Sequence, residues 1–408
     1  MRSAHWAYGL LGILAASTLA AACGSGSDKK TARQDDGGAG GAAGATMNAS
    51  GGGELTPLAG SGGEAPNSGG MPNEALGGAG GTPSQTSGGV GGFGDGGAGG
   101  EPPALPPLPV VDCGTITFND SNLESAIRDA LDKVGTITPA DVASLTDLDA
   151  VAYGITDLSG IECFTNLVSA NFSGGEGTNQ IQNIAPLAYL NNLKTLNLSE
   201  NPVDDLSPLV YLTKLSDLQL NYYALVPDLT PLGQLPSLQN LEINAGTLGK
   251  PASLSALSNI SSLALRYTTG DVSLIKTLTQ LRHLELAYVP IEHQEDLANL
   301  GNLTYLDLLD MGMDSASPLA TLTELSHLYL DENPIADLLP LQNLTGLHEL
   351  GLFGIAATTV KPLVDNQGLS NGDSIDLSYA PLVCANEKVN VDALIARGIT
   401  IAGVNPCP

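Results

Sequence analysis

The sequence has few of the side chains on which most catalytic, metal-binding and nucleic-acid-binding sites depend. Of its 408 residues, 15 are Lys or Arg, 5 are Cys and 5 are His, and aromatic residues make up 4%. Against the 15 cations stand 43 Asp and Glu residues, which gives a formal net charge of -28. Binding to phosphate groups needs a clustered basic surface, so the composition excludes a nucleic-acid ligand.

Motifs of catalysis and metal binding are also missing. No Ser or Cys lies in a recognisable nucleophile turn, no Cys pair has zinc-site spacing, and no loop has the D-x-D-x-D-G spacing of a calcium site. Acidic pairs on adjacent strands could imitate a glycosidase dyad, but an open sheet neither excludes water nor raises a carboxyl pKa. The sequence therefore predicts a protein that is not an enzyme and has no cofactor.

Glycine divides the chain into two parts, since 28 of the 50 glycines lie between Gly24 and Gly100. Residues 23–110 combine Gly, Ala, Ser and Pro with almost no apolar side chains, so burial cannot offset the entropy of ordering them. We interpret this stretch as a disordered tether with a root-mean-square span of roughly 50 Å. The chain as a whole is 42% hydrophobic, too apolar for a disordered protein, so residues 111–408 are expected to fold.

The N-terminal segment has the features of a secretory signal. Arg2 precedes an apolar run from Trp6 to Ala22 that is short for a membrane span and ends in small residues. Residues 1–22 are therefore predicted to be a signal peptide. The letters LAAAC, ending at Cys23, resemble the lipobox of bacterial lipoproteins, which implies lipidation of Cys23 and anchoring to the outer membrane or cell surface. Cleavage without lipidation, which would release a soluble protein, is the alternative.

An apolar anchor recurs through the rest of the chain. Successive anchors are separated by 21 to 26 residues, most often by 22, and they are Leu145, Leu167, Leu193, Leu215, Leu238, Ile260, Leu281, Leu303, Leu325, Leu347 and Leu369. Each unit begins with L-x-x-L-x-L, a short alternating strand, and continues with an apolar residue at every third position, which suits 3₁₀-like turns. One unit cannot bury its own leucines, so stacked units are expected to share a core beside a parallel sheet.

These units resemble the leucine-rich repeat, and residues 193–214 and 325–346 are similar to the 22-residue repeats of internalin-like bacterial surface proteins. The resemblance implies an α/β solenoid: a horseshoe with a parallel sheet on its concave face and 3₁₀ or irregular convex turns. Residues 111–166 are predicted to form a helical N-terminal cap and the first repeat, residues 167–371 further repeats, and residues 372–408 a C-terminal cap.

Helix-start signals and cysteines mark both caps. In the first cap, Ser121 is expected to cap a helix through a capping box with Glu124, and residues 138–141 to open a second short helix. In the second cap, Asn390 is expected to cap a helix that ends at Arg397. An edge strand is expected at residues 399–401. The exported chain would hold four cysteines besides the lipidated one, two beside each cap, which predicts the disulfides Cys113–Cys163 and Cys384–Cys407.

The resemblance also implies an Asn at the ninth position of each unit, where its amide bonds backbone groups of the turn. In this chain that position holds Asn only at Asn201 and Asn333. The other turns are therefore expected to be looser.

Alternation along each strand turns the leucines inward and leaves the residues between them on the concave face. That face and its neighbouring turn are predicted to carry a ligand-binding set rich in Tyr, His and carboxylates: Tyr222, Glu242, Tyr267, His283, Glu285, Tyr288, Tyr305, Asp307, His327, Tyr329, Asp331, Phe353, Asp376 and Tyr379. Surfaces rich in Tyr are typical of binding hot spots.

We therefore predict a monomer that binds a protein or peptide, with the carboxylates selecting a basic partner. Three alternatives stay open for this face. It could recognise a polysaccharide, it could be a solvated sheet of a passive spacer whose tyrosines cover one another, and carboxylates of adjacent strands could bind a cation.

Overall fold

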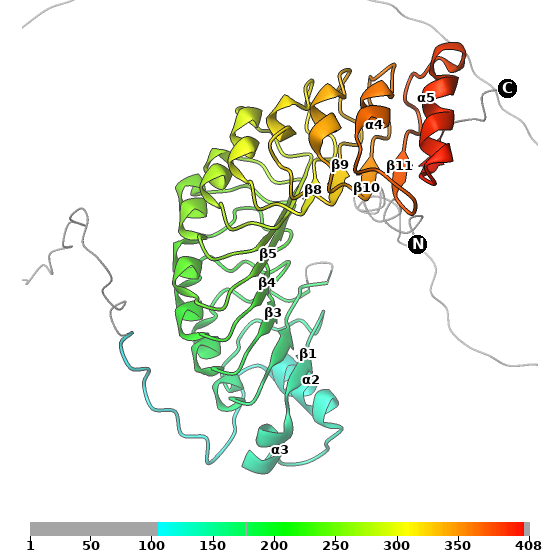
Figure 1. Cartoon of the computed structure of the whole chain (residues 1–408). Coiled ribbons are helices and arrows are strands. Elements are labelled where there is room, and N and C mark those ends of the chain that lie inside the picture. Colours follow the sequence, from blue (N-terminus) through cyan, green and yellow to red (C-terminus); the bar gives the residue numbers. More distant parts are fainter. Residues whose placement is uncertain (1–104, 176–177, 404–408) are drawn as a thin grey trace, which may run out of the picture. The chain divides into compact units, whose positions relative to one another are not determined.

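The computed structural model describes residues 105–175 and 178–403, which form a solenoid (Figure 1). Its sheet has twelve strands in which every strand lies parallel to, and beside, the next one in the sequence. The strands are β1 (Asp147–Asp149), β2 (Ser169–Asn171), β3 (Thr195–Asn197), β4 (Asp217–Gln219), β5 (Asn240–Asn244), β6 (Ser262–Arg266), β7 (His283–Ala287), β8 (Tyr305–Asp307), β9 (His327–Tyr329), β10 (Glu349–Gly351), β11 (Ser374–Asp376) and β12 (Thr400–Ala402).

Short 3₁₀ helices line the side of the solenoid opposite the sheet (Figure 1). They are η2 (Ile161–Cys163), η3 (Ala185–Tyr189), η4 (Ser207–Tyr211), η5 (Thr230–Gln234), η6 (Pro251–Ala256), η7 (Ser273–Thr277), η8 (Gln294–Asn299), η9 (Ser317–Leu319) and η10 (Leu339–Asn343). The backbone N–H of Leu209 donates to the Leu206 carbonyl at 3.0 Å, and Leu212 donates to Leu209 at 2.8 Å. These bonds span three residues, which explains the period of three in the apolar pattern.

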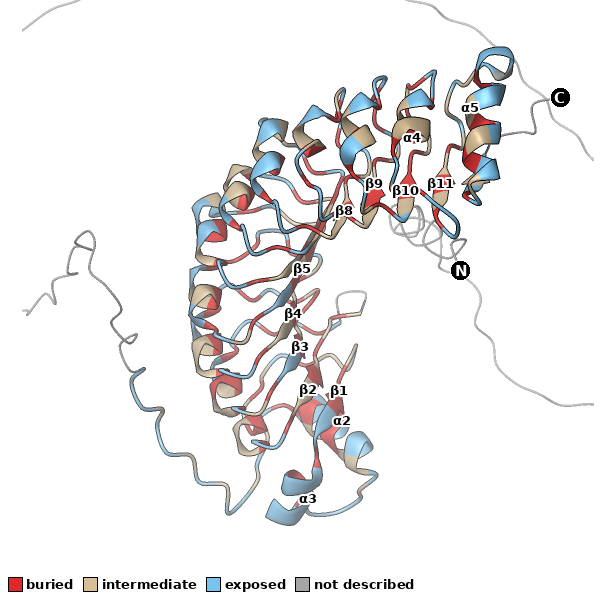
Figure 2. Cartoon of the chain, viewed as in Figure 1, coloured by how far each residue is buried: buried red, intermediate tan, exposed pale blue. Residues whose placement is uncertain are grey.

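The core lies between the sheet and the outer helices, where Figure 2 shows the buried residues. Leu284 of β7 is paired in register with Leu306 of β8, which is paired with Leu328 of β9, and all three are fully buried. The spacing between these partners is 22 residues at each step (306 − 284 and 328 − 306). Stacked leucines thus form one continuous ladder, as expected for units that contact only their neighbours.

Two helices precede β1 in the described chain, and the first of them packs against it. Helix α2 (Ser121–Leu131) begins after Asp120, whose carboxylate accepts from the backbone N–H groups of Asn122 and Leu123. The expectation that Ser121 is the capping residue is therefore wrong, because the preceding carboxylate takes these donors. Helix α3 (Pro139–Ser144) begins after Thr138, which forms the expected capping box with Asp141.

The last units end in α4 (Lys361–Asp365) and α5 (Cys384–Ala396), followed by β12. The expectation that Asn390 caps α5 is wrong, since the helix starts six residues earlier, at Cys384 (390 − 384). Instead, the Asn390 amide donates to the Glu387 carboxylate at 3.0 Å. Arg397 follows the helix and donates to the carbonyls of Val364 at 2.9 Å and Asn366 at 2.7 Å, which ties this end to the preceding unit.

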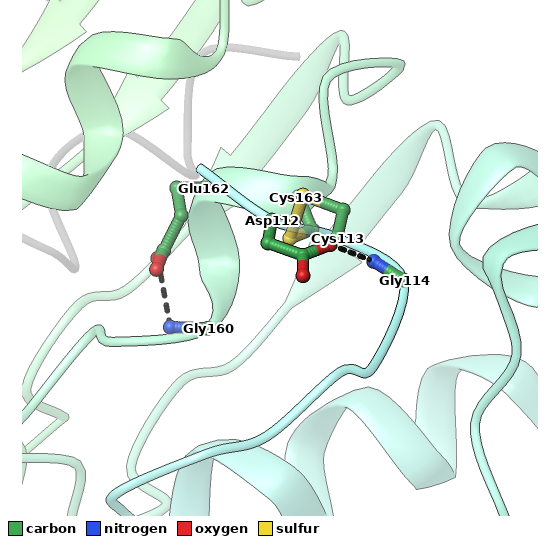
Figure 3. Close-up of a disulfide and its surroundings, with 6 residues drawn as sticks. All are labelled: Asp112, Cys113, Gly114, Gly160, Glu162 and Cys163. Carbon is green, nitrogen blue, oxygen red and sulfur yellow. Dashed lines mark hydrogen bonds between the residues drawn. A yellow bond between two sulfur atoms is a disulfide. The ribbon is translucent and has the colours of Figure 1, made fainter. Parts of the chain in front are cut away.

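The disulfide Cys113–Cys163 predicted for the first cap is present (Figure 3). Beside it, the Asp112 carboxylate accepts from Gly114 N–H at 2.9 Å and the Glu162 carboxylate accepts from Gly160 N–H at 2.7 Å. The pair Cys384–Cys407 stays a prediction, because Cys407 lies outside the described residues. The predicted signal peptide, Cys23 and nearly all of the predicted tether lie outside them as well.

Hydroxyl groups replace Asn at two of the ninth positions. The Asn333 amide donates to the Leu308 carbonyl at 2.6 Å. In their own units, the Tyr223 hydroxyl donates to Leu198 at 2.9 Å and the Thr268 hydroxyl donates to Ile243 at 3.0 Å, and each acceptor again lies 25 residues earlier. The expectation of looser turns is therefore wrong for these two units, since a hydroxyl donor can satisfy the same carbonyl as an amide.

Replacing Cys113 and Cys163 together by Ser should destabilise the first cap. A disulfide that closes a loop with a sequence separation of 50 contributes about 4 kcal/mol in the chain-entropy picture. Because repeats contact only their neighbours, the loss should be local. We expect faster amide hydrogen exchange in α2 and β1 and unchanged exchange in β9 and β10, which serve as the internal control. Uniform acceleration, or none, would contradict this.

Substituting Tyr223→Phe should lower the free energy of unfolding by about 1 kcal/mol, because it removes a buried donor from the Leu198 carbonyl while keeping the ring. The matched control is Tyr379→Phe, since the Tyr379 side chain is 82% exposed. Urea unfolding measures both. Equal midpoints for the two variants would show that the Tyr223 hydroxyl is not a structural donor.

Candidate functional site

The structure leaves all fourteen residues of the predicted binding set accessible to solvent, and none of them belongs to the buried core. They lie on β5–β11 and on the turns that follow these strands and β4. Pairing in register brings many of them together: His283 lies opposite Tyr305, which lies opposite His327, and Glu285 lies opposite Asp307, which lies opposite Tyr329. The set therefore falls into groups with different chemistry.

Four rings of β7–β9 form an aromatic cluster, which consists of His283, Tyr305, His327 and Tyr329. Tyr305 is at its centre: its ring lies 4.0 Å from that of His283 in a stacked pair, 5.9 Å from that of His327 and 5.5 Å from that of Tyr329. Burial raises the pKa of Tyr305 to about 12, so its phenol stays protonated and can donate a hydrogen bond. The cluster offers a wide, amphipathic contact area.

Four further tyrosines occupy a strained backbone position. Tyr222, Tyr267, Tyr288 and Tyr379 have φ angles of 62°, 53°, 56° and 62° in the turns beside the sheet. The left-handed region costs a non-glycine residue roughly 1–2 kcal/mol, and Gly354 holds the same place in its unit with φ of 67°. The fold therefore requires this backbone conformation but not an aromatic side chain there.

These strained tyrosines extend the aromatic surface along the edge of the sheet. The rings of Tyr267 and Tyr288 are stacked at 4.7 Å, and that of Tyr379 meets Phe353 edge-on at 4.9 Å. Tyr222 stands further along the sheet, and its side chain is 60% exposed. Neighbouring tyrosines thus do cover one another in part, as the spacer alternative expects, yet a large share of ring surface stays in water.

An arginine that sequence reasoning missed lies among the acidic residues of β5–β7. Arg266 forms ion pairs with Glu285 and, at 3.4 Å, with Glu242. The ring of His283 also contacts Glu285, with Nε2 2.7 Å from Oε1, and burial followed by the nearby Arg266 lowers the pKa of His283. Glu242 and Glu285 are thus already engaged by a cation. Strand alternation, which places the glutamates on this face, also places Arg266 there. Its positive charge beside two glutamates could have predicted the ion pairs.

Carboxylates dominate the other end of the face, on β8–β11. Asp331 accepts from the Phe353 N–H at 2.7 Å, and burial, together with Asp307 and Asp376, raises the pKa of Asp331 to about 6. The bare Cα of Gly351 leaves space for it, since a Cβ there would lie 3.0 Å from both carboxylate oxygens. The expectation that an open sheet raises no carboxyl pKa is therefore wrong for Asp331, because neighbouring side chains bury this carboxylate and other carboxylates lie near it.

Within residues 105–175 and 178–403, no three His, Cys, Asp or Glu side chains converge in a group able to hold a metal ion. Over the same residues, every helix is too short or too polar to cross a bilayer.

Comparison with known proteins places the fold. No described protein family and no curated protein matches the sequence. Among solved structures, an internalin (inlF) from Listeria monocytogenes is 24% identical over 71% of this chain and 92% of its own, with a TM-score of 0.53. Internalin C2 (inlC2) of the same organism is 26% identical over 61% of this chain and 100% of its own, with a TM-score of 0.43. A plant peptide hormone receptor, RGFR1 in complex with RGF2, is 20% identical over 59% of this chain and 45% of its own, with a TM-score of 0.40.

The fold is a leucine-rich-repeat solenoid. The likeness to inlF and the twelve-stranded parallel sheet agree on this point. The sheet forms the concave face of such a solenoid, so the aromatic cluster, the strained tyrosines and the carboxylates around Asp331 all lie on this face or along its edge.

Replacing Asp331 by Asn should stabilise the protein at neutral pH but not in acid. A carboxyl whose pKa is raised on folding, here from 3.8 to about 6, binds more protons in the folded state, so its contribution to stability falls as pH rises between these values. The Asn amide carbonyl can still accept from Phe353. We expect the free energy of unfolding of the variant to exceed that of the parent by up to about 3 kcal/mol at pH 7.5 and to match it near pH 3.5. A difference independent of pH would contradict the assignment.

Proposed function

We propose that the concave face binds a segment of another protein, or a peptide, without chemical turnover. The observation that carries this proposal is the placing of tyrosine at four turn positions whose backbone conformation does not require a ring, since the same place holds Ala245, Glu332 or Gly354 in other units. Tyrosine supplies large, rigid contact area at low entropic cost, which is the property of binding hot spots.

The charge pattern supports a partner with a basic region. Burial, together with repulsion from Asp307 and Asp376, raises the pKa of Asp331, and a Lys or Arg brought by a ligand would relieve the repulsive part. At β5–β7 the glutamates are already paired with Arg266. The basic part of the partner should therefore lie over β8–β11, with apolar or aromatic parts over the cluster around Tyr305.

We further infer that the domain acts outside the cytoplasm as a lipid-anchored protein. The support is the apolar run before Cys23 and its resemblance to a lipobox, followed by a glycine-rich stretch long enough to serve as a tether. A domain on such a tether can sample the space near a membrane surface. The role that follows is recognition of a macromolecule at the cell envelope or cell surface.

Affinity capture with the full chain tests the proposal. Tagged parent protein should retain a specific protein or peptide, and the variant with Tyr288, Tyr305 and Tyr329 changed to Ala should lose it, because these rings supply the central contact area. The control changes Tyr189 and Tyr211, on the convex helices η3 and η4, to Ala and should retain the partner. Both variants must first match the parent in thermal stability.

Salt dependence then separates the ligand classes. A basic protein partner should be lost between about 0.05 and 0.5 M salt, because screening weakens exposed ion pairs, whereas a neutral polysaccharide should stay bound. Retention of a glycan, or identical profiles for parent and triple variant, would overturn the proposal, and the second result would favour a passive spacer.

A further inference from the structure

A groove of about 580 Å³ opens beside the turns that follow β3, β4 and β5, away from the aromatic cluster. The apolar part of its lining consists mainly of Leu225, Pro227 and the ring of Tyr222, while Val203 and Val226 are each only 2% exposed. Leu225 is 63% exposed and Tyr222 is 60% exposed. Large apolar side chains with so much surface in water need an explanation when they line one concavity.

The groove exists because one unit has an extra residue in its turn. In the preceding unit the buried Val203 follows the ninth-position Asn201 by two residues (203 − 201), but here the buried Val226 follows Tyr223 by three (226 − 223). Tyr223 is fixed by its bond to Leu198, and Val226 by the bond from its N–H to the Thr247 carbonyl at 2.8 Å. Because Tyr223 and Val226 are both held inward, Leu225 between them is directed outward.

A glycine on the next unit preserves the space around this leucine. A Cβ at Gly249 would lie 2.9 Å from Leu225 Cδ1 and 3.3 Å from the Val226 carbonyl oxygen. The leucine thus contacts bare backbone on one side and water on the other. Neither the core nor the polar ladder of the turns uses its side chain.

The rim of the groove is acidic. Glu200, Asp204 and Asp228 line it together with one cation, Lys250. Lys250 Nζ lies 2.9 Å from the Asp228 carboxylate, so this pair is neutral and the charge of Glu200 and Asp204 is left in excess. An occupant that brings positive charge beside an apolar group would complement both the walls and the rim.

We propose that this groove is a second binding site, which receives one apolar side chain of a peptide flanked by Lys or Arg. An apolar side chain complements Leu225 and Pro227, and a flanking cation complements Glu200 and Asp204, so a basic peptide matches both parts of the lining. The site is separate from the aromatic cluster, and of the predicted binding set only Tyr222 lines it. It stands on the exposed Leu225, the inserted residue and the rim charges, and it does not require the concave face to bind anything.

Saturation-transfer NMR on the full chain tests the proposal with defined probes. The probes are the capped tripeptide acetyl-Arg-Leu-Arg-amide, its charge-reversed counterpart acetyl-Glu-Leu-Glu-amide, and maltohexaose. We expect signal on the leucine methyl groups of the Arg peptide and none from the other two. Leu225→Ser should weaken binding of the Arg peptide at least about fivefold, since the substitution removes most of an apolar contact.

Matched variants keep the result specific. Leu339→Ser makes the same change at a leucine that is 57% exposed on the convex helix η10, and binding should be unchanged. Glu200→Gln combined with Asp204→Asn should weaken the Arg peptide and reduce its salt dependence. The variant with Tyr288, Tyr305 and Tyr329 changed to Ala should bind the tripeptide normally, which separates this site from the concave face.

Three results would overturn the proposal. The first is absence of binding by the Arg peptide, and the second is binding that Leu225→Ser leaves intact. The third is maltohexaose binding that depends on Leu225, which would identify the groove as a glycan site. Loss of concave-face capture alone would not affect it.

Discussion

The whole structure depends on one constraint: a single repeat cannot bury its own leucines. Leu284 is shielded because Leu306 and its equivalents stack in register on both sides, and the parallel pairing of the strands keeps that register over all twelve strands of the described chain. The ends of the ladder have no further repeat, so helix α2 packs against β1 at one end and α5 packs against α4 at the other. The Cys113–Cys163 disulfide lies in the same N-terminal part of the chain as α2. At each end a helix reduces the apolar surface that a further repeat would otherwise bury.

Stacking also brings backbone carbonyls of the turns into the interior, where each needs a donor. Asn333 fills this role with an amide, while Tyr223 and Thr268 fill it with hydroxyls that reach the equivalent carbonyl of the preceding unit. The requirement is therefore a donor at a given point in space rather than a given residue type. Repeats can depart from the Asn pattern there without losing the turn.

Because inward positions carry the stability, outward positions of the sheet are available for other chemistry. The aromatic cluster, Arg266 with its glutamates, and the carboxylates around Asp331 all occupy such positions, and the strained tyrosines stand in turns whose backbone is fixed by the fold. Leu225 is likewise directed outward, but it lies in a turn, and one inserted residue is the cause. Where side chains are freed from packing in this way, an unusual residue is informative about binding.

The sequence by itself determined the repeat, the short strands, the 3₁₀ turns and which residues share the open face, since these follow from apolar spacing and strand alternation, which are local properties. It also indicated the Cys113–Cys163 pair. Only the tertiary structure decided that Asp120 rather than Ser121 caps α2, that α5 begins before Asn390, and that Arg266 pairs with Glu242 and Glu285. The raised pKa of Asp331 and the groove at Leu225 likewise depend on side chains from neighbouring units. Distances across repeats are set by stacking, and spacing along the chain does not encode them.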